Sequence, residues 1–191
     1  MNNAPHIVNR QHLFAAQWLR LDLVHYVDRR GHERKWEAAQ RINCNGAVLM
    51  IAELRASGEI ILVRQYRPPA DKEVIEFPAG LIDDGETPDE TAVRELLEET
   101  GYHGTVTDVS LPGFNSPGMT GEMIYTVSMN IDDSAPRNRE PVSKQEESED
   151  IETFLVRKDE LEVFLRDAAG KGWGIDAKVI TYARGVGPKK Q

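Results

Sequence analysis

The sequence predicts an α+β protein with a mixed central sheet, a small antiparallel β element near the N-terminus, and one helix whose two ends are both specified. Two observations carry this prediction. Runs of β-prone residues follow one another with turn residues between them, as expected for paired strands. A helix over residues 88–100 is marked by capping signals at both ends. With 191 residues, the chain suits one domain of ordinary size and a modest additional element.

The expected elements follow in order along the chain. Residues 18–28 alternate apolar and polar side chains, a turn follows at 28–31, and residues 32–42 return as a second strand of a small hairpin. The first dozen residues give no clear signal. The later strands are expected at residues 46–54, 59–66, 73–77, 104–110, 122–131 and 151–157, and the later helices at residues 158–169 and 176–184.

Domain boundaries follow from this order. We expect an N-terminal β element over residues 1–43, the main domain over residues 44–186, and a frayed tail over residues 187–191. Residues 132–150 contain proline, are highly charged and have almost no apolar side chains. Such a segment is expected to be a mobile loop, either functional or simply disordered.

Composition and charge restrict the class of protein. Residues are 40% hydrophobic, and the longest apolar run, residues 46–52, is too short to cross a bilayer. The net charge of −9 argues against nucleic acid as a partner, because binding it needs a clustered basic face. Charged residues interrupt the first thirty positions, so no secretion signal is evident. We expect a cytoplasmic protein, or a nuclear one in a eukaryote, with no membrane partner.

Cysteine and histidine usage points to oxygen as the ligand of any bound metal. Cys44 is the single cysteine, so it cannot form a disulfide within the chain. The five histidines are scattered and show no zinc-binding spacing.

The helix over residues 88–100 carries the candidate chemistry. Glu95, Glu98 and Glu99 share one arc of it at about 100° per residue. Arg94 has Glu90 and Glu98 four residues away on either side, whereas Glu95 and Glu99 have no cation in helical register. From spacing alone, two interpretations stay open: a solvated acidic face, or a site for a hard divalent cation.

The residues around this helix resemble the complete Nudix box. Gly80, Glu86 and the segment RELLEETG at residues 94–101 occupy its specified positions. Tyr102 departs from the pattern, which prefers an aliphatic residue there. The resemblance implies an α/β/α sandwich and metal-dependent hydrolysis of a pyrophosphate. Gly80 would permit the tight backbone of the loop, and Glu86 would tie the loop to the helix.

The same resemblance implies the ligands of the metal. Glu95, Glu98 and Glu99 would be the principal ligands, and Ala79 would offer its backbone carbonyl. Two to three Mg²⁺ ions are implied, with Mn²⁺ as an alternative. Metal ions are needed because hydrolysis builds negative charge on a phosphorus centre already surrounded by anionic oxygens.

Three flanking segments resemble the ADP-ribose and ADP-sugar pyrophosphatase branch of the family. They are residues 65–69, 75–83 and 115–118, and Pro117 matches the proline that marks the branch. The implied reaction converts ADP-ribose into AMP and ribose 5-phosphate. Two alternatives are another nucleoside diphosphate derivative, such as a dinucleoside polyphosphate, NADH or an oxidised nucleotide, and a non-catalytic module that senses ADP-ribose. A sensor usually lacks a box glutamate, and here all are present.

Four further residues are candidates for substrate binding. Arg67 can hold a phosphate through two parallel hydrogen bonds, although an Arg-Pro-Pro segment is also a common rigid turn. Trp18 and Trp36 alone indicate packing in a core or dimer more often than base binding. Their spacing resembles that of dimeric ADP-sugar pyrophosphatases, in which tryptophans from two subunits enclose adenine. That resemblance implies a homodimer and a base or phosphate contact for Arg41.

The resemblance also implies a general base on the loop before the strand at residues 151–157. The register points to Glu149 as the group that deprotonates the attacking water, alongside the catalytic box residues Glu98 and Glu99. The neighbouring acids stay open as alternatives for the base, namely Glu146, Glu147, Asp150 and Glu152.

Overall fold

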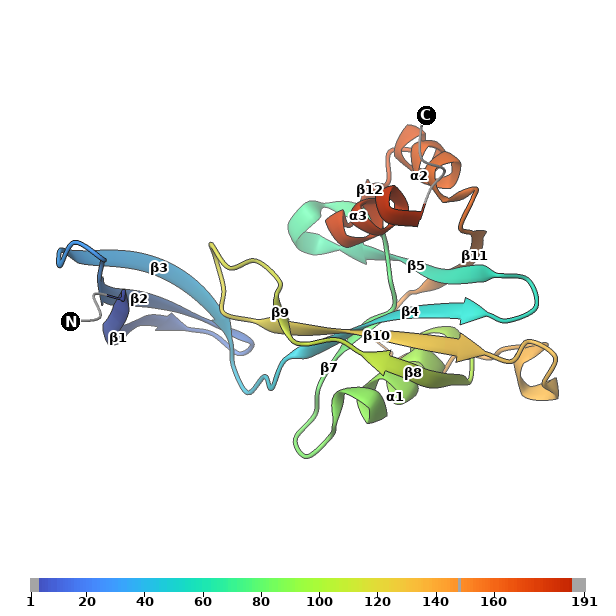
Figure 1. Ribbon diagram of the computed structural model, residues 1–191, viewed down its shortest axis with the longest axis horizontal. Coiled ribbons are helices and arrows are strands. Elements are labelled where there is room, and N and C mark those ends of the chain that lie inside the picture. Colours follow the sequence, from blue (N-terminus) through green and yellow to red (C-terminus); the bar gives the residue numbers. More distant parts are fainter. Residues whose placement is uncertain (1–3, 148, 187–191) are drawn as a thin grey trace. The chain divides into compact units, whose positions relative to one another are not determined.

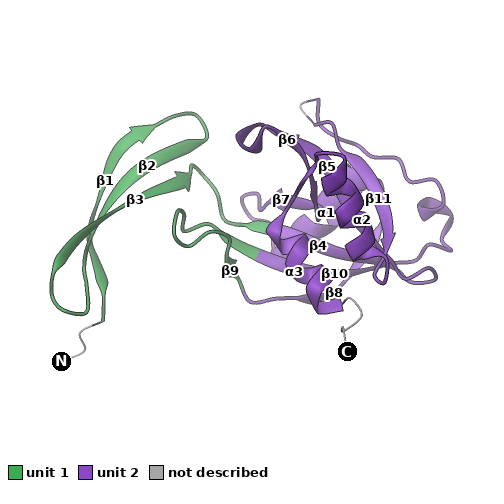
Figure 2. Ribbon diagram, turned by 90° about the horizontal axis from the view of Figure 1, so that it is seen from above, with its two compact units in different colours: residues 1–47, 112–124 green, residues 48–111, 125–191 purple. Residues whose placement is uncertain are grey.

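A computed structural model describes residues 4–147 and 149–186. The chain forms two compact units (Figure 2). The N-terminal unit comprises Met1–Ala47 and Pro112–Ile124, and the core unit comprises Val48–Leu111 and Tyr125–Gln191. The expected N-terminal β element is therefore joined by a second segment, residues 112–124. The tail expected at residues 187–191 lies outside the described residues.

The N-terminal unit is built on a three-stranded antiparallel sheet in the order β1-β2-β3 (Figure 1). Its strands are β1 (His6–Ala15), β2 (Leu19–Val27) and β3 (Glu33–Arg41). The expected hairpin is confirmed as β2 and β3, with Val24 opposite Trp36. Asp28 specifies the turn between them, because its carboxylate accepts hydrogen bonds from the backbone N–H groups of Arg30 and His32.

Strand β1 was absent from the sequence prediction. Every residue of β1 is exposed in this structure, so no buried face imposes an alternation of apolar and polar side chains. Its hydrogen bonds to β2 define it instead, and they are visible only in three dimensions.

The larger sheet is mixed, as expected, with the order β12-β6-β5-β4-β10-β8. Strand β12 is parallel to β6, whereas β6 and β11 are antiparallel to β5. The strands are β4 (Ala47–Leu54), β5 (Glu59–Arg67), β6 (Lys72–Glu76), β7 (Ala79–Leu81), β8 (Gly104–Val109), β9 (Gly113–Phe114), β10 (Met123–Ile131), β11 (Glu152–Arg157) and β12 (Gly174–Ile175). Strands β7, β9 and β12 were not predicted, because two or three residues are too few to show a period.

Three helices accompany the sheet: α1 (Pro88–Thr100), α2 (Leu161–Gly170) and α3 (Ala177–Val186). Helix α1 contacts β7 and β8, whereas α2 and α3 contact β6, β11 and β12. Figure 1 shows α1 on one side of the strands and α2 and α3 on the other. This arrangement confirms the expected sandwich. None of the helices in the described residues has the length and apolar character needed to cross a membrane.

The buried core of this unit fixes α1 against the sheet. Leu96 and Ala92 of α1 are fully buried together with Met50 of β4, Ile61 of β5 and Met129 of β10. Burying a leucine, isoleucine or methionine side chain stabilises a fold by about 1.5–3 kcal/mol. On the neighbouring acidic arc of α1, Glu99 is also buried, whereas Glu95 and Glu98 are partly buried.

The capping signals of α1 are confirmed. Thr87 and Glu90 form a reciprocal capping box, and Pro88 occupies the first turn. Gly101 ends the helix in the left-handed conformation with φ of 76°.

Part of the segment over residues 132–150, which was expected to be mobile and either functional or disordered, has defined local structure. Asn138 is buried, accepts a hydrogen bond from the His103 N–H, and donates to the carbonyls of His103 and Asp132. A short 3₁₀ helix covers Pro136–Asn138. Composition did not reveal this order, because backbone and amide hydrogen bonds hold the segment and apolar burial contributes little.

Candidate active site

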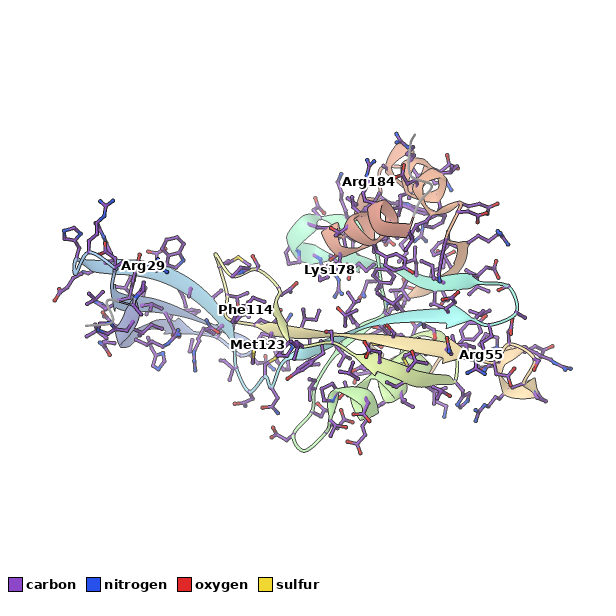
Figure 3. The ribbon with its side chains drawn as sticks, in the orientation of Figure 1. Arg29, Arg55, Phe114, Met123, Lys178 and Arg184 are labelled. Carbon is purple, nitrogen blue, oxygen red and sulfur yellow. The ribbon has the colours of Figure 1, made fainter. Side chains whose placement is uncertain are left out.

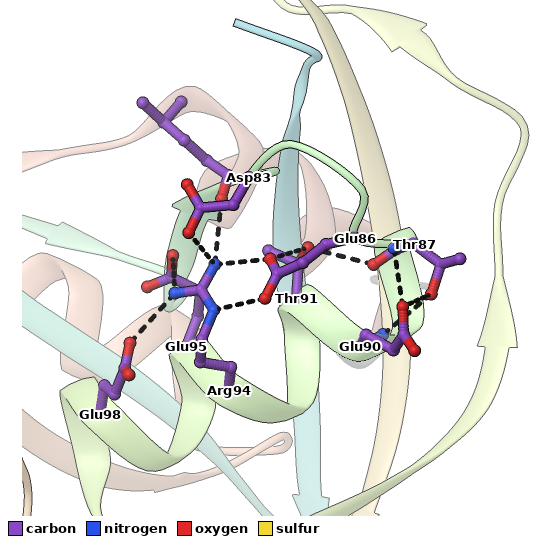
Figure 4. A network of polar contacts seen from close by, with 9 residues as sticks. Asp83, Glu86, Thr87, Glu90, Thr91, Arg94, Glu95 and Glu98 are labelled. Atoms are coloured by element: carbon purple, nitrogen blue, oxygen red, sulfur yellow. Dashed lines mark hydrogen bonds and ion pairs between the residues drawn. The ribbon is translucent and has the colours of Figure 1, made fainter.

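The loop before α1 is tied to the helix through Glu86 (Figure 4). Its carboxylate accepts hydrogen bonds from Arg94 Nε and Nη2, both at 2.8 Å, and from the Thr91 hydroxyl at 2.8 Å. These contacts, led by the Arg94 hydrogen bonds, lower the pKa of Glu86 to about 2. Glu86 therefore remains ionised near neutral pH and fixes the loop, in agreement with its expected role.

The remaining guanidinium nitrogen of Arg94 reaches the acidic arc (Figure 4). Arg94 Nη1 donates to Glu95 Oε1 at 2.8 Å and to Glu98 Oε2 at 3.1 Å. Glu95 thus has a cation beside it, although not in helical register, because the Arg94 side chain turns toward its neighbour in the chain. One sequence expectation needs correction here. Glu90 is not a partner of Arg94 in the described contacts, because its carboxylate accepts the Thr87 N–H and hydroxyl.

Gly80 allows the backbone of β7 to lie directly against the Glu95 carboxylate. A Cβ at this position would lie 1.9 Å from Glu95 Cδ, far inside van der Waals contact. The requirement for glycine at this position is therefore close approach.

Glu99 is the buried member of the acidic arc. Its side chain accepts a hydrogen bond from the Ala79 N–H at 3.2 Å. Burial, followed by repulsion from Glu95, raises the pKa of Glu99 to about 8, against the opposing effect of the Ala79 hydrogen bond. The role expected for the Ala79 carbonyl as a metal ligand stays a prediction.

The donor set fits a hard divalent cation. In the described residues no three acidic side chains converge as a ready metal cluster, and Arg94 donates to oxygens of both Glu95 and Glu98. Glu99 nevertheless has only a backbone N–H as its described hydrogen-bond donor, and burial raises the pKa of Glu95 as well. A bound cation would relieve the cost of holding these adjacent carboxylates ionised away from water.

Glu149 lies within electrostatic reach of the same carboxylates. Burial is the main cause of the raised pKa of Glu95 and Glu99, and the charge of Glu149 adds to it in both. Glu149 Oε2 also accepts a hydrogen bond from the Glu146 N–H at 3.0 Å, which orients its side chain. The alternative Glu152 is directed elsewhere, since its carboxylate pairs with Arg64 at 2.5 Å.

Arg67 is held by Glu76, a partner that the sequence did not reveal. Its Nε and Nη2 donate to the two carboxylate oxygens of Glu76 at 2.8 and 2.7 Å. The charge of Arg67 also opposes the rise in the pKa of Glu99. Two guanidinium nitrogens are thus already paired, and a phosphate contact by Arg67 stays a prediction.

Trp36 and Pro117 line one cavity of about 720 Å³ within the N-terminal unit. The Trp36 indole donates to the Gly118 carbonyl at 3.0 Å, which joins β3 to the segment of residues 112–124. Phe114, another lining residue, lies opposite Met123 in the pairing of β9 with β10 (Figure 3). The cavity walls are mostly apolar, as expected for a surface that receives a flat ring.

The other two predicted binding residues lie outside the lining of this cavity. Trp18 is 69% exposed and is not a lining residue. Arg41 donates from Nε to Glu122 at 2.5 Å, and Glu122 also accepts from the Asn115 side chain. Glu122 had no distinguishing signal in the sequence, because its partner Arg41 lies far away along the chain.

Comparisons with known proteins address the family and the fold of the chain. The NUDIX domain family model matches residues 45–180. The ADP-ribose pyrophosphatase of Saccharomyces cerevisiae is 37% identical over 184 residues, which cover 92% of this chain and 80% of that protein. The ADP-sugar pyrophosphatase of Mus musculus is 34% identical over 187 residues, covering 93% of this chain and 85% of that protein.

A solved structure has the same fold. The crystal structure of an ADP compounds hydrolase superposes with a TM-score of 0.70 at 21% identity, covering 94% of this chain and 90% of that one. A sandwich with a capped helix that carries carboxylates is the arrangement expected for a Nudix hydrolase. The match to the NUDIX family model identifies the family. The chain belongs to the Nudix family.

Proposed function

We propose that this Nudix hydrolase cleaves the pyrophosphate bond of ADP-ribose, or of a closely related ADP-sugar. From ADP-ribose the products are AMP and ribose 5-phosphate. The observation that carries the proposal is the buried Glu99 beside Glu95 on a rigidly capped helix. The substrate is supported by relatives named ADP-ribose and ADP-sugar pyrophosphatase that align over more than nine-tenths of the chain. The test is the release of AMP from a panel of nucleotides.

Glu95, Glu98 and Glu99 would hold the divalent cations, with the Ala79 carbonyl as a further oxygen ligand. Mg²⁺ is the proposed ion, in two to three copies, with Mn²⁺ as the alternative. Such ions would neutralise charge on the pyrophosphate oxygens and lower the pKa of the attacking water. Arg94 can keep its two hydrogen bonds to Glu86 while Nη1 releases Glu95 and Glu98, so the loop stays fixed when a ligand takes these carboxylates.

Glu149 would accept the proton of the attacking water. The water oxygen forms a bond to phosphorus, the P–O bond to the bridging oxygen breaks, and that oxygen leaves with the departing phosphate. A carboxylate suits this role when it is ionised near neutral pH and within hydrogen-bond reach of the water. The influence of Glu149 on both Glu95 and Glu99 supports a position beside the reaction centre.

We also propose that the enzyme is a homodimer formed through its N-terminal unit. This unit exposes many large apolar side chains, which a soluble monomer rarely leaves uncovered. They are Ile7, Val8, Leu13, Phe14, Trp18, Leu19, Leu21, Trp36, Phe114, Met119 and Met123. In the dimer, Trp18 of one subunit and Trp36 of the other would enclose adenine, with Arg41 and Pro117 nearby.

Replacing either tryptophan by alanine is expected mainly to raise KM for ADP-ribose. Each replacement removes stacking worth about 1–3 kcal/mol per base, which corresponds to roughly a 5- to 150-fold effect. Steady-state kinetics gives KM, and sedimentation should report about twice the chain mass of 21.5 kDa. Trp173→Phe is a matched control, because Trp173 packs on Arg64 in the core unit. An active monomer with unchanged KM in both alanine variants would refute this assignment.

A further inference from the structure

The side chain of Gln145 joins the segment that carries Glu149 to the end of the catalytic helix. Its Oε1 accepts a hydrogen bond from the Ile151 N–H at 3.0 Å, and its Nε2 donates to the Ile151 carbonyl at 2.8 Å. The same Nε2 lies 3.2 Å from the carbonyl oxygen of Glu99 and donates to it. One carboxamide thus contacts the backbone of a proposed metal ligand and the backbone two residues after the proposed base.

The end of α1 explains why a donor is needed there. The last carbonyls of a helix have no partners within the helix and must find donors elsewhere. Here the Leu97 carbonyl accepts the Gly101 N–H, and the Glu98 carbonyl accepts the Lys144 N–H at 2.8 Å. Gln145 serves the next carbonyl, that of Glu99. Residues 144 and 145 therefore supply donors from outside the helix to two of the last carbonyls of α1.

Gly101 permits this close approach. A Cβ at residue 101 would lie 2.4 Å from the backbone nitrogen of Val142, and 2.8 Å from the carbonyl carbon of Pro141. Residues 141 and 142 thus pass directly against the end of α1. The last glycine of the Nudix box is required here both for its positive φ and for the space it leaves.

The other side of Ile151 is fixed independently. Strand β11 begins at Glu152, which pairs with Arg64 in register, and the two side chains also form an ion pair. Arg64 in turn lies 4.2 Å from the ring centre of Trp173. This anchor holds β11 to β5 but does not reach α1, so the described side-chain link between the base segment and α1 is made by Gln145.

We propose that Gln145 is a positioning residue that sets Glu149 relative to the metal-binding carboxylates of α1. The inference rests on the proposed role of Glu149 as the general base. Gln145 uses both ends of its carboxamide on backbone groups, and its Nε2 also donates to the Ser143 hydroxyl at 3.4 Å. It therefore acts through the placement of Glu149 and does not touch the reacting atoms. A base must be held within hydrogen-bond reach of the water, and displacement by about 1 Å can lower a rate roughly 100-fold.

The test compares Gln145→Met with the parent enzyme on ADP-ribose and Mg²⁺. Methionine keeps the length of the side chain and removes its hydrogen bonds. We expect kcat to fall roughly 10- to 100-fold, with KM and the Mg²⁺ concentration for half activity within about twofold. The midpoint of thermal unfolding should stay within about 4 °C. Lys144→Ala is the matched control, because the exposed Lys144 contacts α1 through its backbone N–H.

A double-mutant cycle separates positioning of the base from a general structural role. In a Glu149→Gln background, Gln145→Met should change kcat by less than about twofold, because there is no base left to position. An equal loss of kcat in both backgrounds, or a single variant within twofold of the parent, would overturn the proposal. If the methionine variant does not fold, Gln145→Asn replaces it in the same cycle, because it keeps the carboxamide but shortens its reach by one methylene group.

Failure of the inference is distinguishable from failure of the proposed function. Full activity in Glu149→Gln would remove the base assignment whatever Gln145 does, and with it this inference. A strong loss in Glu149→Gln together with an unchanged Gln145→Met would leave the function standing and overturn only the positioning role.

Discussion

Replacing Glu99 by glutamine is expected to lower kcat for ADP-ribose hydrolysis by roughly two to four orders of magnitude. Glutamine has the shape of glutamate and can still accept the Ala79 N–H, so the backbone around the site should not move. What disappears is the buried negative charge that would bind the cation, and metal stabilisation of transition-state charge is worth several kcal/mol. Initial rates at saturating Mg²⁺ and ADP-ribose measure the effect.

Stability in the absence of metal provides the control for Glu99→Gln. Burial raises the pKa of Glu99 to about 8, so the folded protein disfavours its charged form. Removing that charge should leave the midpoint of thermal unfolding in EDTA unchanged or raise it. Asp89→Asn makes the same isosteric change on an exposed residue of α1 and should keep activity within about twofold. Activity of Glu99→Gln within threefold of the parent would remove Glu99 from the metal site.

Replacing Glu149 by glutamine is expected to lower kcat about 10²- to 10⁴-fold, the usual contribution of a general base. The variant should bind ADP-ribose and Mg²⁺ almost as tightly as the parent, because Glu149 is proposed to contact the water and not the cation. This pattern differs from Glu99→Gln, which should also weaken activation by Mg²⁺. The measurement is kcat and KM for ADP-ribose across a Mg²⁺ titration.

Glu146→Gln and Glu147→Gln are the matched comparisons for this prediction, because both residues are exposed acids of the same segment. Loss of activity in either, with Glu149→Gln active, would show that the register assigned to the base is wrong while its segment is right. If all three variants stay active, the base belongs to the Nudix box itself.

Helix α1 shows what the sequence could predict. Its ends are specified by neighbours in the chain: Thr87 and Glu90 cap one end, and Gly101 terminates the other. Helical periodicity then placed Glu95 and Glu99 on one arc and Leu96 on the neighbouring apolar arc, and the burial of Leu96 agrees with that placement. Signals of this kind are local, so they can be read before the fold is known.

The contacts that could not be predicted are non-local or depend on side-chain direction. Gln145 lies in a polar run, and nothing in its neighbours indicates that its carboxamide meets the Glu99 carbonyl. From the sequence, Arg67 was expected to be free to bind a phosphate. Its partner Glu76 could not be recognised, because only the pairing of β5 with β6 brings the two side chains together. The sideways reach of Arg94 to Glu95 also lies outside the i, i+4 pattern of helical pairs.

The central claim is tested most directly by AMP release from ADP-ribose by the purified protein, in Mg²⁺ and in EDTA. Product analysis should show AMP and ribose 5-phosphate in equal amounts with Mg²⁺, no turnover in EDTA, and recovery when Mg²⁺ is restored. The kcat/KM for ADP-ribose should exceed that for diadenosine polyphosphates and NADH, with ADP-glucose showing how far other ADP-sugars are accepted. Undiminished turnover in EDTA, or a higher kcat/KM for one of the non-sugar nucleotides, would contradict the account.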